Sequence, residues 1–321
     1  MTRVAVIDDW QGVAEQSADW TQLRARAEVV IFRDAFADED AAAQQLADFD
    51  VVMAMRERTA FPASLVRRLG KLRLFSLTGA RARSVDMDAL RAQGVTITTT
   101  KGGGTGTATA ELALTLMLSA LRHLPRADAA IRAGGFQGGV PAGEEASGKT
   151  LGLVGLGHLG RMMARYGQVL GMTVIAWSQN LTAEKAAESG VAYRTKDALL
   201  AESDVVSLHL VLSDRTRGII GANDLARMRP GALLINTSRG PLVDEAALVA
   251  VLHAGRIRAA LDVYDREPLP AGHPLRTAPN TVLTPHLGYC SAATFRDFYH
   301  ESVENVLAFL DGKRLRVLEA G

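Results

Sequence analysis

Residues 151–160 read LGLVGLGHLG, and this stretch decides how the rest of the chain is interpreted. Gly155, Gly157 and Gly160 have the spacing G-x-G-x-x-G, which by itself is a weak signal. Here an apolar run, LGLVG, leads into the glycines. An amphipathic stretch, LGRMMARYGQVLG, follows them, and a second apolar run, TVIAWS, comes next. The sequence therefore predicts a strand, a tight turn, a helix and a second strand, in that order.

A turn of this kind is typical of a dinucleotide-binding site. The first glycine allows the tight turn, the second lets a pyrophosphate approach the backbone, and the third lets helix and strand pack closely. The amino-terminal end of the helix then faces the anion with its unpaired N–H groups. We therefore predict that Gly155, Gly157 and Gly160 bind a dinucleotide cofactor.

The end of the second strand leaves the choice between NAD and NADP open. An NAD site usually has an acidic residue there, which binds the ribose 2′-hydroxyl. In this chain Trp177 is followed by Ser178, Gln179 and Asn180. The absence of an acid removes the main obstacle to a 2′-phosphate, yet no arginine is present at these positions to attract one. Ser178 and Gln179 can hydrogen-bond either ribose, so we predict NAD or NADP without a preference.

Strand-like and helix-like segments alternate in two series along the 321 residues. In the first series, short apolar runs predict buried strands at 4–8, 29–32, 51–55, 72–78 and 95–100. In the second, they predict strands at 150–155, 173–178, 205–211, 231–238, 258–264 and 281–287. A glycine-rich loop (101–109) and a strongly apolar helix (110–124) separate the two series. The pattern predicts an α/β protein with two Rossmann-like domains, each built on a parallel sheet.

Composition excludes several classes of function. Lys and Arg total 36 against 35 Asp and Glu, so a net charge of +1 gives no sign of a nucleic-acid or membrane partner. No apolar run approaches the length of about 18 residues that a membrane span needs. The single cysteine, Cys290, rules out an internal disulfide and favours a reducing, cytoplasmic location. The histidines in apolar runs lack metal-ligand spacing, so we predict no metal site.

Three polar residues of the second series are candidates for chemistry. Arg239 comes directly after one predicted strand, His286 lies at the end of another, and Glu267 is in a turn before Pro268. Ligands of open α/β sheets bind beyond the carboxyl ends of the strands, so the three side chains can face one crevice. Singly, each is more often an ion-pair partner or a structural residue. Downstream of a dinucleotide turn, their combination favours catalysis.

These residue types suit the reduction of a 2-oxo acid by a nicotinamide cofactor. A planar guanidinium such as that of Arg239 supplies two parallel donors for a carboxylate and a carbonyl. A histidine such as His286 can donate a proton to the developing alkoxide near neutral pH. A carboxylate such as Glu267 would keep that imidazole protonated and oriented.

The chain resembles the D-isomer-specific 2-hydroxyacid dehydrogenases over essentially its whole length. The motifs that carry the resemblance, in the family's order, are ATAELALTLMLSALRHL, VGLGHLG, NTSRGPLVDEAAL, LDVYDREPLP and TPHLGYCS. The resemblance implies that Arg239, Glu267 and His286 are the catalytic residues. It implies further cofactor contacts at Thr109, His158, Leu159, Thr237, Ser238, Arg239, Asp262, His286 and Gly288.

The resemblance also implies an architecture. A dinucleotide-binding domain (102–290) is expected to be inserted into a catalytic domain made of 1–101 and 291–321. The C-terminal helix is then expected to return and pack on the first hundred residues. Members of the family usually form dimers through the cofactor domain, so we expect a homodimer that uses the helix near 110–124.

The expected substrate is a small 2-oxo acid of the glyoxylate or hydroxypyruvate type, reduced to the D-2-hydroxy acid. Many members of the family bind its carboxylate on a Gly-x-Gly loop, which corresponds here to TGARARSVD (78–86). Gly79 fits this pattern, whereas Arg81 and Arg83 replace smaller or acidic residues and add positive charge. The predicted substrate contacts are Arg56, Gly79, Ala80, Arg81, Arg239 and Tyr289.

Two other functions remain open. Some relatives use the same fold as a dinucleotide-sensing dimeric binding protein without significant turnover, although the near-neutral charge argues against that role here. A different Rossmann enzyme, such as a methyltransferase, is disfavoured by the combination of Arg239, Glu267 and His286 at strand ends.

Overall fold

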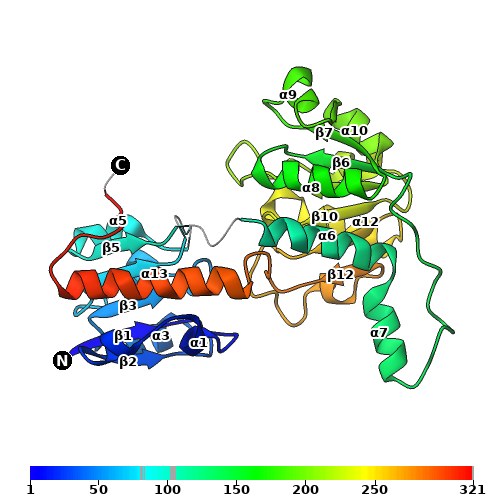
Figure 1. The fold of residues 1–321 in the computed structure, drawn as a ribbon. Coiled ribbons are helices and arrows are strands. Elements are labelled where there is room, and N and C mark those ends of the chain that lie inside the picture. The colour runs from blue at the N-terminus through cyan, green and yellow to red at the C-terminus, as the bar shows by residue number, and fades with distance from the viewer. Residues whose placement is uncertain (80–81, 83, 102–105, 320–321) are drawn as a thin grey trace. The chain divides into compact units, whose positions relative to one another are not determined.

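The chain forms two α/β units, each with its own parallel sheet (Figure 1). The computed structural model describes residues 1–79, 82, 84–101 and 106–319. The first unit consists of Met1–Thr105 and Cys290–Gly321, and the second, Gly106–Tyr289, is inserted between those two segments. The predicted fold class, two Rossmann-like domains with one inserted into the other, is confirmed.

The first sheet has five parallel strands in the order β2-β1-β3-β4-β5. Their bounds are β1 (Thr2–Val6), β2 (Ala27–Ile31), β3 (Val51–Ala54), β4 (Leu74–Leu77) and β5 (Thr96–Thr99). The strands lie where the apolar runs predicted them, and β3 and β4 are buried at every residue. The strand order reverses between the neighbours β1 and β3. From β1 the chain continues to β2 on one side of the pair, and from β3 it continues to β4 on the other side. Ligands of open parallel sheets bind at such a point.

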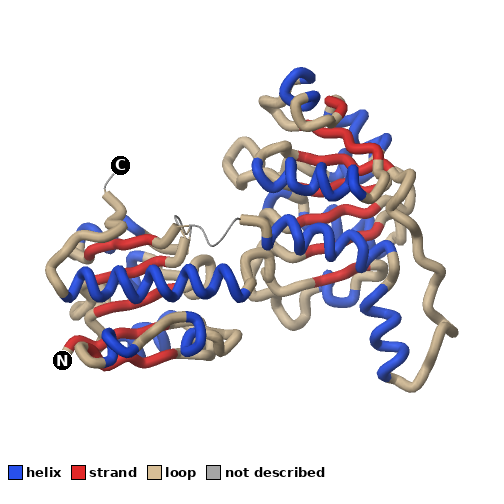
Figure 2. Tube along the Cα trace, viewed as in Figure 1, coloured by secondary structure: helices blue, strands red, loops and turns tan. Residues whose placement is uncertain are grey.

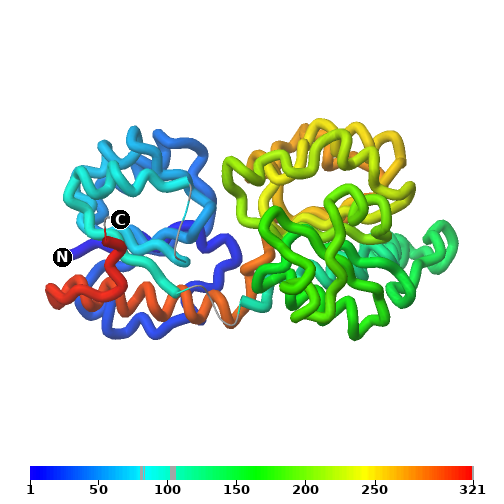
Figure 3. Tube along the Cα trace, turned by 90° about the horizontal axis from the view of Figure 1, so that it is seen from above, coloured from blue at the N-terminus to red at the C-terminus, as the bar shows by residue number. Residues whose placement is uncertain are grey.

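Helices cover both faces of the first sheet (Figure 3). On one face the C-terminal helix α13 (Ala292–Leu310) packs against β4 and against α1 (Ala14–Ser17) and α2 (Thr21–Arg24). The other face carries α3 (Glu39–Leu46), α4 (Ala63–Val66) and α5 (Met87–Ala92). The return of the C-terminal helix to the first hundred residues, implied by the family resemblance, is confirmed.

The second sheet has seven parallel strands in the order β12-β11-β10-β9-β6-β7-β8. Their bounds are β6 (Thr150–Val154), β7 (Thr173–Trp177), β8 (Ala192–Tyr193), β9 (Val205–Leu208), β10 (Leu233–Asn236), β11 (Arg258–Leu261) and β12 (Thr281–Leu283). Six of these strands were predicted. The seventh, β8, was missed because two residues carry no periodic signal. The strand order reverses between β6 and β9.

Two layers of helices sandwich the second sheet (Figure 2). One layer contains α6 (Ala108–Leu121) and α8 (His158–Val169), and the other contains α10 (Lys196–Glu202), α11 (Ala222–Arg227) and α12 (Glu245–His253). A short helix, α9 (Ala183–Ala187), contacts β8, and the 3₁₀ turns η1 (Gly240–Leu242) and η2 (Pro274–Thr277) follow β10 and β11. Among the described residues, no helix is long and apolar enough to cross a membrane.

The apolar helix expected over 110–124 is shorter than predicted. Helix α6 ends at Leu121, and a separate helix, α7 (Leu124–Arg132), follows it. The break occurs because His123 adopts a left-handed conformation with φ +52°, which cannot continue a right-handed helix. Helix α7 buries none of its residues, and the region after it was expected to be irregular.

The register of the second sheet brings the ends of five strands level with one another. Val154 of β6 pairs with Leu208, Leu208 with Asn236, Asn236 with Leu261, and Leu261 with Leu283. The residues that come directly after these positions therefore lie along a single edge of the sheet, and they are Gly155, His209, Thr237, Asp262 and Thr284. This edge carries the candidate site.

Candidate active site

The glycine turn after β6 leaves open space at its middle position. Gly155 has φ +105°, and a Cβ there would lie 2.5 Å from the carbonyl oxygen of His209. A Cβ on Gly160 would lie 2.1 Å from the carbonyl oxygen of Gly155, so helix and strand touch at this residue. At Gly157 a Cβ would meet no atom of the described residues within 4 Å. The turn is thus packed at both ends and open in the middle, as a pyrophosphate cradle requires.

Helix α8 presents its amino-terminal end at this open position. It begins at His158, runs for 12 residues, and is preceded by Gly157, whose missing side chain leaves the first N–H groups uncapped. Gly157 and His158 are exposed, and Leu159 is half-buried. The N–H groups and the helix dipole both favour an anion at this point. The residues present therefore fit the phosphates of a dinucleotide.

The end of β7 presents neutral polar groups. Ser178 is half-buried, and Gln179 is exposed and donates from Nε2 to the carbonyl oxygen of Arg215 at 3.1 Å. This contact uses one of the two N–H donors of the Gln179 amide, and its Oε1 is an acceptor that a ribose hydroxyl can use. The geometry leaves the choice between NAD and NADP open.

His286 and Glu267 form a close pair at the edge of the second sheet. The His286 Nδ1 and the Glu267 Oε2 are 2.5 Å apart, and both side chains are about three-quarters buried, with exposed fractions of 20% and 27%. Glu267 is held in turn by its other oxygen, Oε1, which accepts a hydrogen bond from the backbone N–H of Tyr264 at 2.9 Å. The pairing fixes Nδ1 as the nitrogen that faces Glu267, and Nε2 is on the opposite side of the ring.

The backbone at His286 is in a sparsely populated conformation, with φ +55°. Such a conformation persists only where the surroundings impose it, and it is common at functional sites. Here the main-chain N–H of His286 donates to the carbonyl oxygen of Asp262 at 2.8 Å. The His286 backbone is thereby fastened to the end of the adjacent strand β11.

Asp262 holds the loop that carries His286. Its Oδ1 accepts from the hydroxyl of Thr284 at 2.6 Å and from the N–H of Leu287 at 2.7 Å, and its Oδ2 accepts from the N–H of Gly288 at 2.8 Å. Asp262 is completely buried. Burial raises the pKa of this carboxyl above its ordinary value, and the three hydrogen bonds oppose the rise. Asp262 therefore determines where His286 and Gly288 lie.

Thr109 reaches the same loop from the start of α6. Its hydroxyl donates to the carbonyl oxygen of Gly288 at 2.9 Å. A Cβ added to Gly288 would lie 3.3 Å from Thr109 and 3.3 Å from Asp262 Oδ2, so the loop is closely packed here. Three residues predicted as cofactor contacts, Thr109, Asp262 and Gly288, are thus assembled in one place. Their assignment as cofactor contacts remains a prediction.

Arg239 lies in a tight turn directly after β10. The Asn236 side chain makes two hydrogen bonds within the turn: its Oδ1 accepts from the Ser238 N–H at 3.0 Å, and its Nδ2 donates to the carbonyl oxygen of Arg239 at 2.8 Å. The Ser238 hydroxyl donates to the carbonyl oxygen of Leu208 at 2.7 Å. The guanidinium Nη1 donates to the carbonyl oxygen of Ser238 at 2.7 Å. These bonds fix the main chain of the Arg239 turn at the sheet edge.

The Arg239 turn also touches the segment that carries Glu267. A Cβ on Gly240 would lie 2.0 Å from the carbonyl carbon of Tyr264, so only glycine allows this approach. Thr237, another predicted cofactor contact, is buried, and its hydroxyl lacks a hydrogen-bond partner among the described residues. The ring of Tyr289 lies edge-on to His286, with centroids 5.8 Å apart.

His209, interpreted from the sequence as structural, comes directly after β9 and lies against the glycine turn. Its Nε2 lies 2.9 Å from Ser207 Oγ, and its buried Nδ1 has no hydrogen-bond partner in the part of the chain that the structure describes. Burial lowers the pKa of His209 to about 4. The imidazole is therefore neutral at physiological pH and adds no positive charge next to the turn.

The predicted substrate residues of the first unit follow β3 and β4. The Arg56 side chain lies against Gly79, since a Cβ on Gly79 would come within 2.7 Å of Arg56 Nη1. Gly79 has φ +74°, and its N–H donates to Thr100 Oγ1 at 2.8 Å. The other two predicted residues, Ala80 and Arg81, lie outside the described residues, as does Arg83.

Two supporting residues were not predicted from the sequence. Tyr264 supplies the N–H that holds Glu267, and its hydroxyl donates to the carbonyl oxygen of Thr284 at 2.9 Å. Thr284 supplies the hydroxyl that holds Asp262. Both lie within three residues of a predicted catalytic residue in the motifs LDVYDREPLP and TPHLGYCS. Their closeness in sequence to Glu267 and His286 was the signal that could have identified them as supporting residues.

The fold and site define a Rossmann-type dinucleotide-binding protein with a histidine–carboxylate pair at its sheet edge. The family model for the NAD binding domain of D-isomer specific 2-hydroxyacid dehydrogenases matches residues 114–288. The chain therefore belongs to the D-isomer specific 2-hydroxyacid dehydrogenase family, and its second unit is the NAD binding domain of that family.

Several characterised proteins and solved structures are similar to the chain. Glyoxylate reductase of Aeropyrum pernix is 40% identical over 206 residues, which is 62% of each protein. D-3-phosphoglycerate dehydrogenase of Mycobacterium tuberculosis is 36% identical over 241 residues, 75% of this chain and 45% of that protein. The chain thus matches about half to three-fifths of the length of these relatives.

A solved structure of phosphoglycerate oxidoreductase from Vibrio cholerae O395 matches over nearly the whole chain. It has a TM-score of 0.91 and 37% identity, and the match covers 97% of this chain and 100% of that one.

Proposed function

We propose that the protein is an NAD(P)-dependent dehydrogenase that reduces a small 2-oxo acid to the D-2-hydroxy acid. The observation that supports this most strongly is the 2.5 Å pair of His286 and Glu267, which lies at the same edge of the NAD binding domain's sheet as the glycine turn. Relatives named glyoxylate reductase and D-3-phosphoglycerate dehydrogenase act on substrates of this chemical class.

His286 is the proposed proton donor. Because its Nδ1 faces Glu267, the proton that reaches the substrate oxygen leaves from Nε2. The Glu267 carboxylate stabilises the protonated imidazole and fixes the ring orientation, and it is itself fixed by the Tyr264 N–H. A dinucleotide held by Gly155, Gly157 and the start of α8 would supply a hydride to the carbonyl carbon, and His286 would supply the proton to the carbonyl oxygen.

Arg239 is the proposed anchor of the 2-oxo acid. A guanidinium can donate two parallel hydrogen bonds, one to the substrate carboxylate and one to the carbonyl that is being reduced. The second bond strengthens as negative charge develops on the carbonyl oxygen, so Arg239 contributes to turnover as well as to binding. We propose Arg56 and Gly79 of the first unit as further contacts for the substrate, together with Ala80, Arg81 and Tyr289.

A spectrophotometric matrix tests the proposed reaction. NADH and NADPH are each combined with glyoxylate, hydroxypyruvate, pyruvate, phenylpyruvate and 2-oxoglutarate. We expect strong oxidation of one cofactor with at least one acid. Chiral analysis of the product should give the D-isomer for every acid except glyoxylate, whose product glycolate is achiral. Cofactor binding with no oxidation in any of the ten pairs would point first to a substrate outside this set. It would point second to the alternative, a dinucleotide-sensing dimeric binding protein without significant turnover.

We also propose the domain roles, the location and the oligomeric state. Residues 1–101 with 291–321 bind the substrate, and 102–290 bind the dinucleotide. The protein acts in the cytoplasm, where its single thiol stays reduced, and it has neither a nucleic-acid nor a membrane partner.

A homodimer through the second unit is supported by exposed apolar side chains next to α6. Leu124 and Ile131 of α7 are 53% and 56% exposed, and Phe136 is 74% exposed. Exposed apolar groups of this size, close together in sequence, are typical of a contact surface. Sedimentation should give twice the chain mass, and Ile131→Glu should shift the equilibrium towards the monomer. A monomer in the unaltered protein would contradict the proposal.

A further inference from the structure

A basic pocket lies at the amino-terminal edge of the first sheet. Its walls are the residues that lead into β4 and β5, the end of α13, and the chain segment after α13. Arg73 lies directly before β4, and the half-buried Phe309 of α13 and Leu318 of the segment after α13 give the pocket an apolar surface. The cavity has a volume of about 450 Å³, which is within the range of small-molecule sites.

Four cationic side chains line this pocket: Arg73, Arg91, Lys313 and Arg314. Glu319 is the acidic residue among the lining residues that the structure describes. The whole chain has a net charge of only +1, so this concentration of positive charge is local. A concave surface with one sign of charge attracts ligands of the opposite sign.

The carboxylates that pair with these cations compete only weakly with an anionic ligand. Arg91 pairs with Asp88 at 2.9 Å, and Lys313 pairs with Asp311 at 3.4 Å. Asp88 is 94% exposed, and Arg314 pairs with an exposed Glu319. Ion pairs between exposed groups contribute little to stability, so an anion that enters the pocket can replace these carboxylates at little cost.

Two of the arginines retain binding capacity in the described part of the chain. The guanidinium of Arg73 lies over the Phe309 ring, 5.7 Å from its centroid, and no carboxylate of the described residues pairs with it. Arg91 donates through its other nitrogens to Asp88 and to the carbonyl oxygen of Glu319, but its buried Nε lacks a described hydrogen-bond partner.

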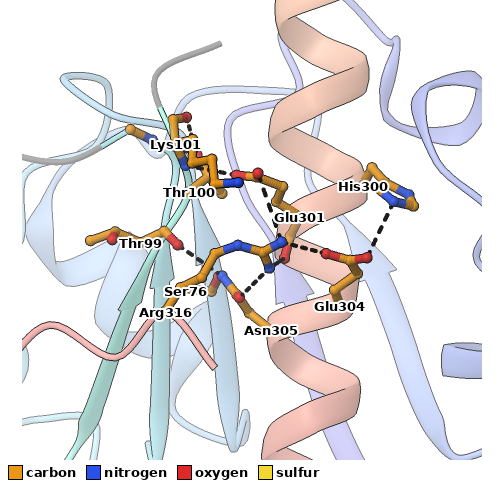
Figure 4. Close-up of polar contacts among 10 residues, drawn as sticks. Ser76, Thr99, Thr100, Lys101, His300, Glu301, Glu304, Asn305 and Arg316 are labelled. Atoms are coloured by element: carbon orange, nitrogen blue, oxygen red, sulfur yellow. Dashed lines mark hydrogen bonds and ion pairs between the residues drawn. The ribbon is translucent and has the colours of Figure 1, made fainter. Parts of the chain in front are cut away.

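The outer wall of the pocket is held in place by a polar cluster around Arg316 (Figure 4). Arg316 Nη2 pairs with Glu304 at 2.6 Å, and its Nη1 donates to Asn305 Oδ1 at 3.0 Å. The following residues pair with β5 as an antiparallel edge, through the bridge between Thr98 and Val317. The segment that carries Arg314 and Glu319 is therefore attached to both α13 and the sheet.

We propose that this pocket binds a small organic anion, a phosphate or carboxylate attached to a flat apolar group. Arg73, Arg91 and Arg314 supply charge-assisted hydrogen bonds to the anionic end. The apolar body lies against Phe309 and Leu318.

This site is separate from the predicted substrate residues of the same unit. The strands of the first sheet are all parallel, so their amino-terminal ends lie at the edge opposite to Arg56 and Gly79. The ligand therefore acts as an effector or a bound metabolite and does not occupy the proposed reaction site. The inference does not depend on the proposed reaction.

Calorimetric titration of the full-length protein with 1-naphthyl phosphate tests the proposal. The titration is run with saturating NADH and NADPH, which block the dinucleotide site. We expect one binding event that the double variant Arg73→Gln/Arg314→Gln weakens by about tenfold or more. Arg67→Gln is the matched control, because Arg67 is an exposed arginine of the same unit outside the pocket. Both arginines of the double variant are exposed, so we expect it to fold.

Inorganic phosphate provides a second measurement. It should bind at least about tenfold more weakly than 1-naphthyl phosphate, because it lacks the apolar body that contacts Phe309. Three results would overturn the proposal: no binding by the unaltered protein, equal affinity in the double variant, or an equal loss in Arg67→Gln. Because binding is measured directly, its absence is distinguishable from a failure of 2-oxo acid reduction.

Discussion

Replacing His209 by glutamine should change how the stability of the second unit depends on pH. In the folded chain the pKa of His209 is about 4, compared with 6.5 for an unburied histidine, because burial disfavours the charged imidazole. Above pH 6.5 the ring is neutral in the folded and unfolded states alike, and its contribution to stability is complete. As the pH falls from 6.5 towards 4, only the unfolded chain takes up the proton, and the folded state loses stability.

The magnitude follows from the difference between the two pKa values. Each pKa unit corresponds to about 1.4 kcal/mol, so His209 should account for a loss of about 3 kcal/mol between pH 7 and pH 4. Glutamine does not titrate, and its amide can replace the Nε2 contact with Ser207. His209→Gln should therefore lose less stability than the unaltered protein over this interval.

Urea denaturation monitored by tryptophan fluorescence measures the effect in a Trp10→Phe/Trp20→Phe background, where Trp177 of the same unit is the remaining tryptophan. The difference in unfolding free energy between the two proteins should change by about 3 kcal/mol from pH 7 to pH 4. His253→Gln is the control, because His253 is an exposed histidine of the same unit. Identical pH dependence of the unaltered protein and His209→Gln would refute the reasoning.

Two further predictions concern the glycine turn and the loop of His286. Gly157→Val should weaken NAD(P)H binding, measured by fluorescence titration, without lowering the melting temperature. Gly160→Ala should destabilise the fold by about 3 kcal/mol, because the Cβ of the alanine would lie 2.1 Å from a carbonyl oxygen. Equal melting temperatures of the two variants would contradict this. Asp262→Asn should lower the free energy of unfolding by about 2 kcal/mol, because the N–H group of the new amide would face the Gly288 N–H that now donates to Asp262 Oδ2. It should also lower kcat, and full turnover would show that Asp262 does not position His286.

Much of the fold was predictable because burial leaves a periodic trace. The β3 residues VVMA and the β4 residues LFSL are buried at every position, and short apolar runs with no alternation are typical of parallel strands. The glycine turn was predictable for a different reason: Gly155 and Gly160 each meet a local steric demand, and Gly157 leaves space for a ligand.

Other parts of the fold depend on interactions that leave no such trace. Helix α6 ends three residues earlier than predicted because His123 takes a positive φ, which histidine does not require. Helix α7 has an amphipathic pattern but buries no residue of its own unit. Because α7 contributes no residue to the core, the pattern of buried residues could not predict it.

The sequence predicted which residues form the candidate site, but it did not predict the hydrogen bonds that hold them in place. Sequence motifs brought Arg239, Glu267 and His286 together as candidates. The support of Glu267 by the Tyr264 N–H, and of the His286 loop by Asp262, depends on turn geometry and on the register of β11 with β12. Distances of this kind follow from tertiary packing, so sequence spacing alone does not yield them.

The measurement that tests the account most directly is the steady-state turnover of His286→Ala, with cofactor affinity determined in parallel. Removal of the proton donor should lower kcat by about 10²- to 10⁴-fold, while NAD(P)H binding stays within about twofold of the unaltered protein. Glu267→Gln, which keeps the shape of the pair but removes the charge, should give a smaller loss and an altered pH profile. Full turnover by His286→Ala would contradict the proposed role of the His286–Glu267 pair.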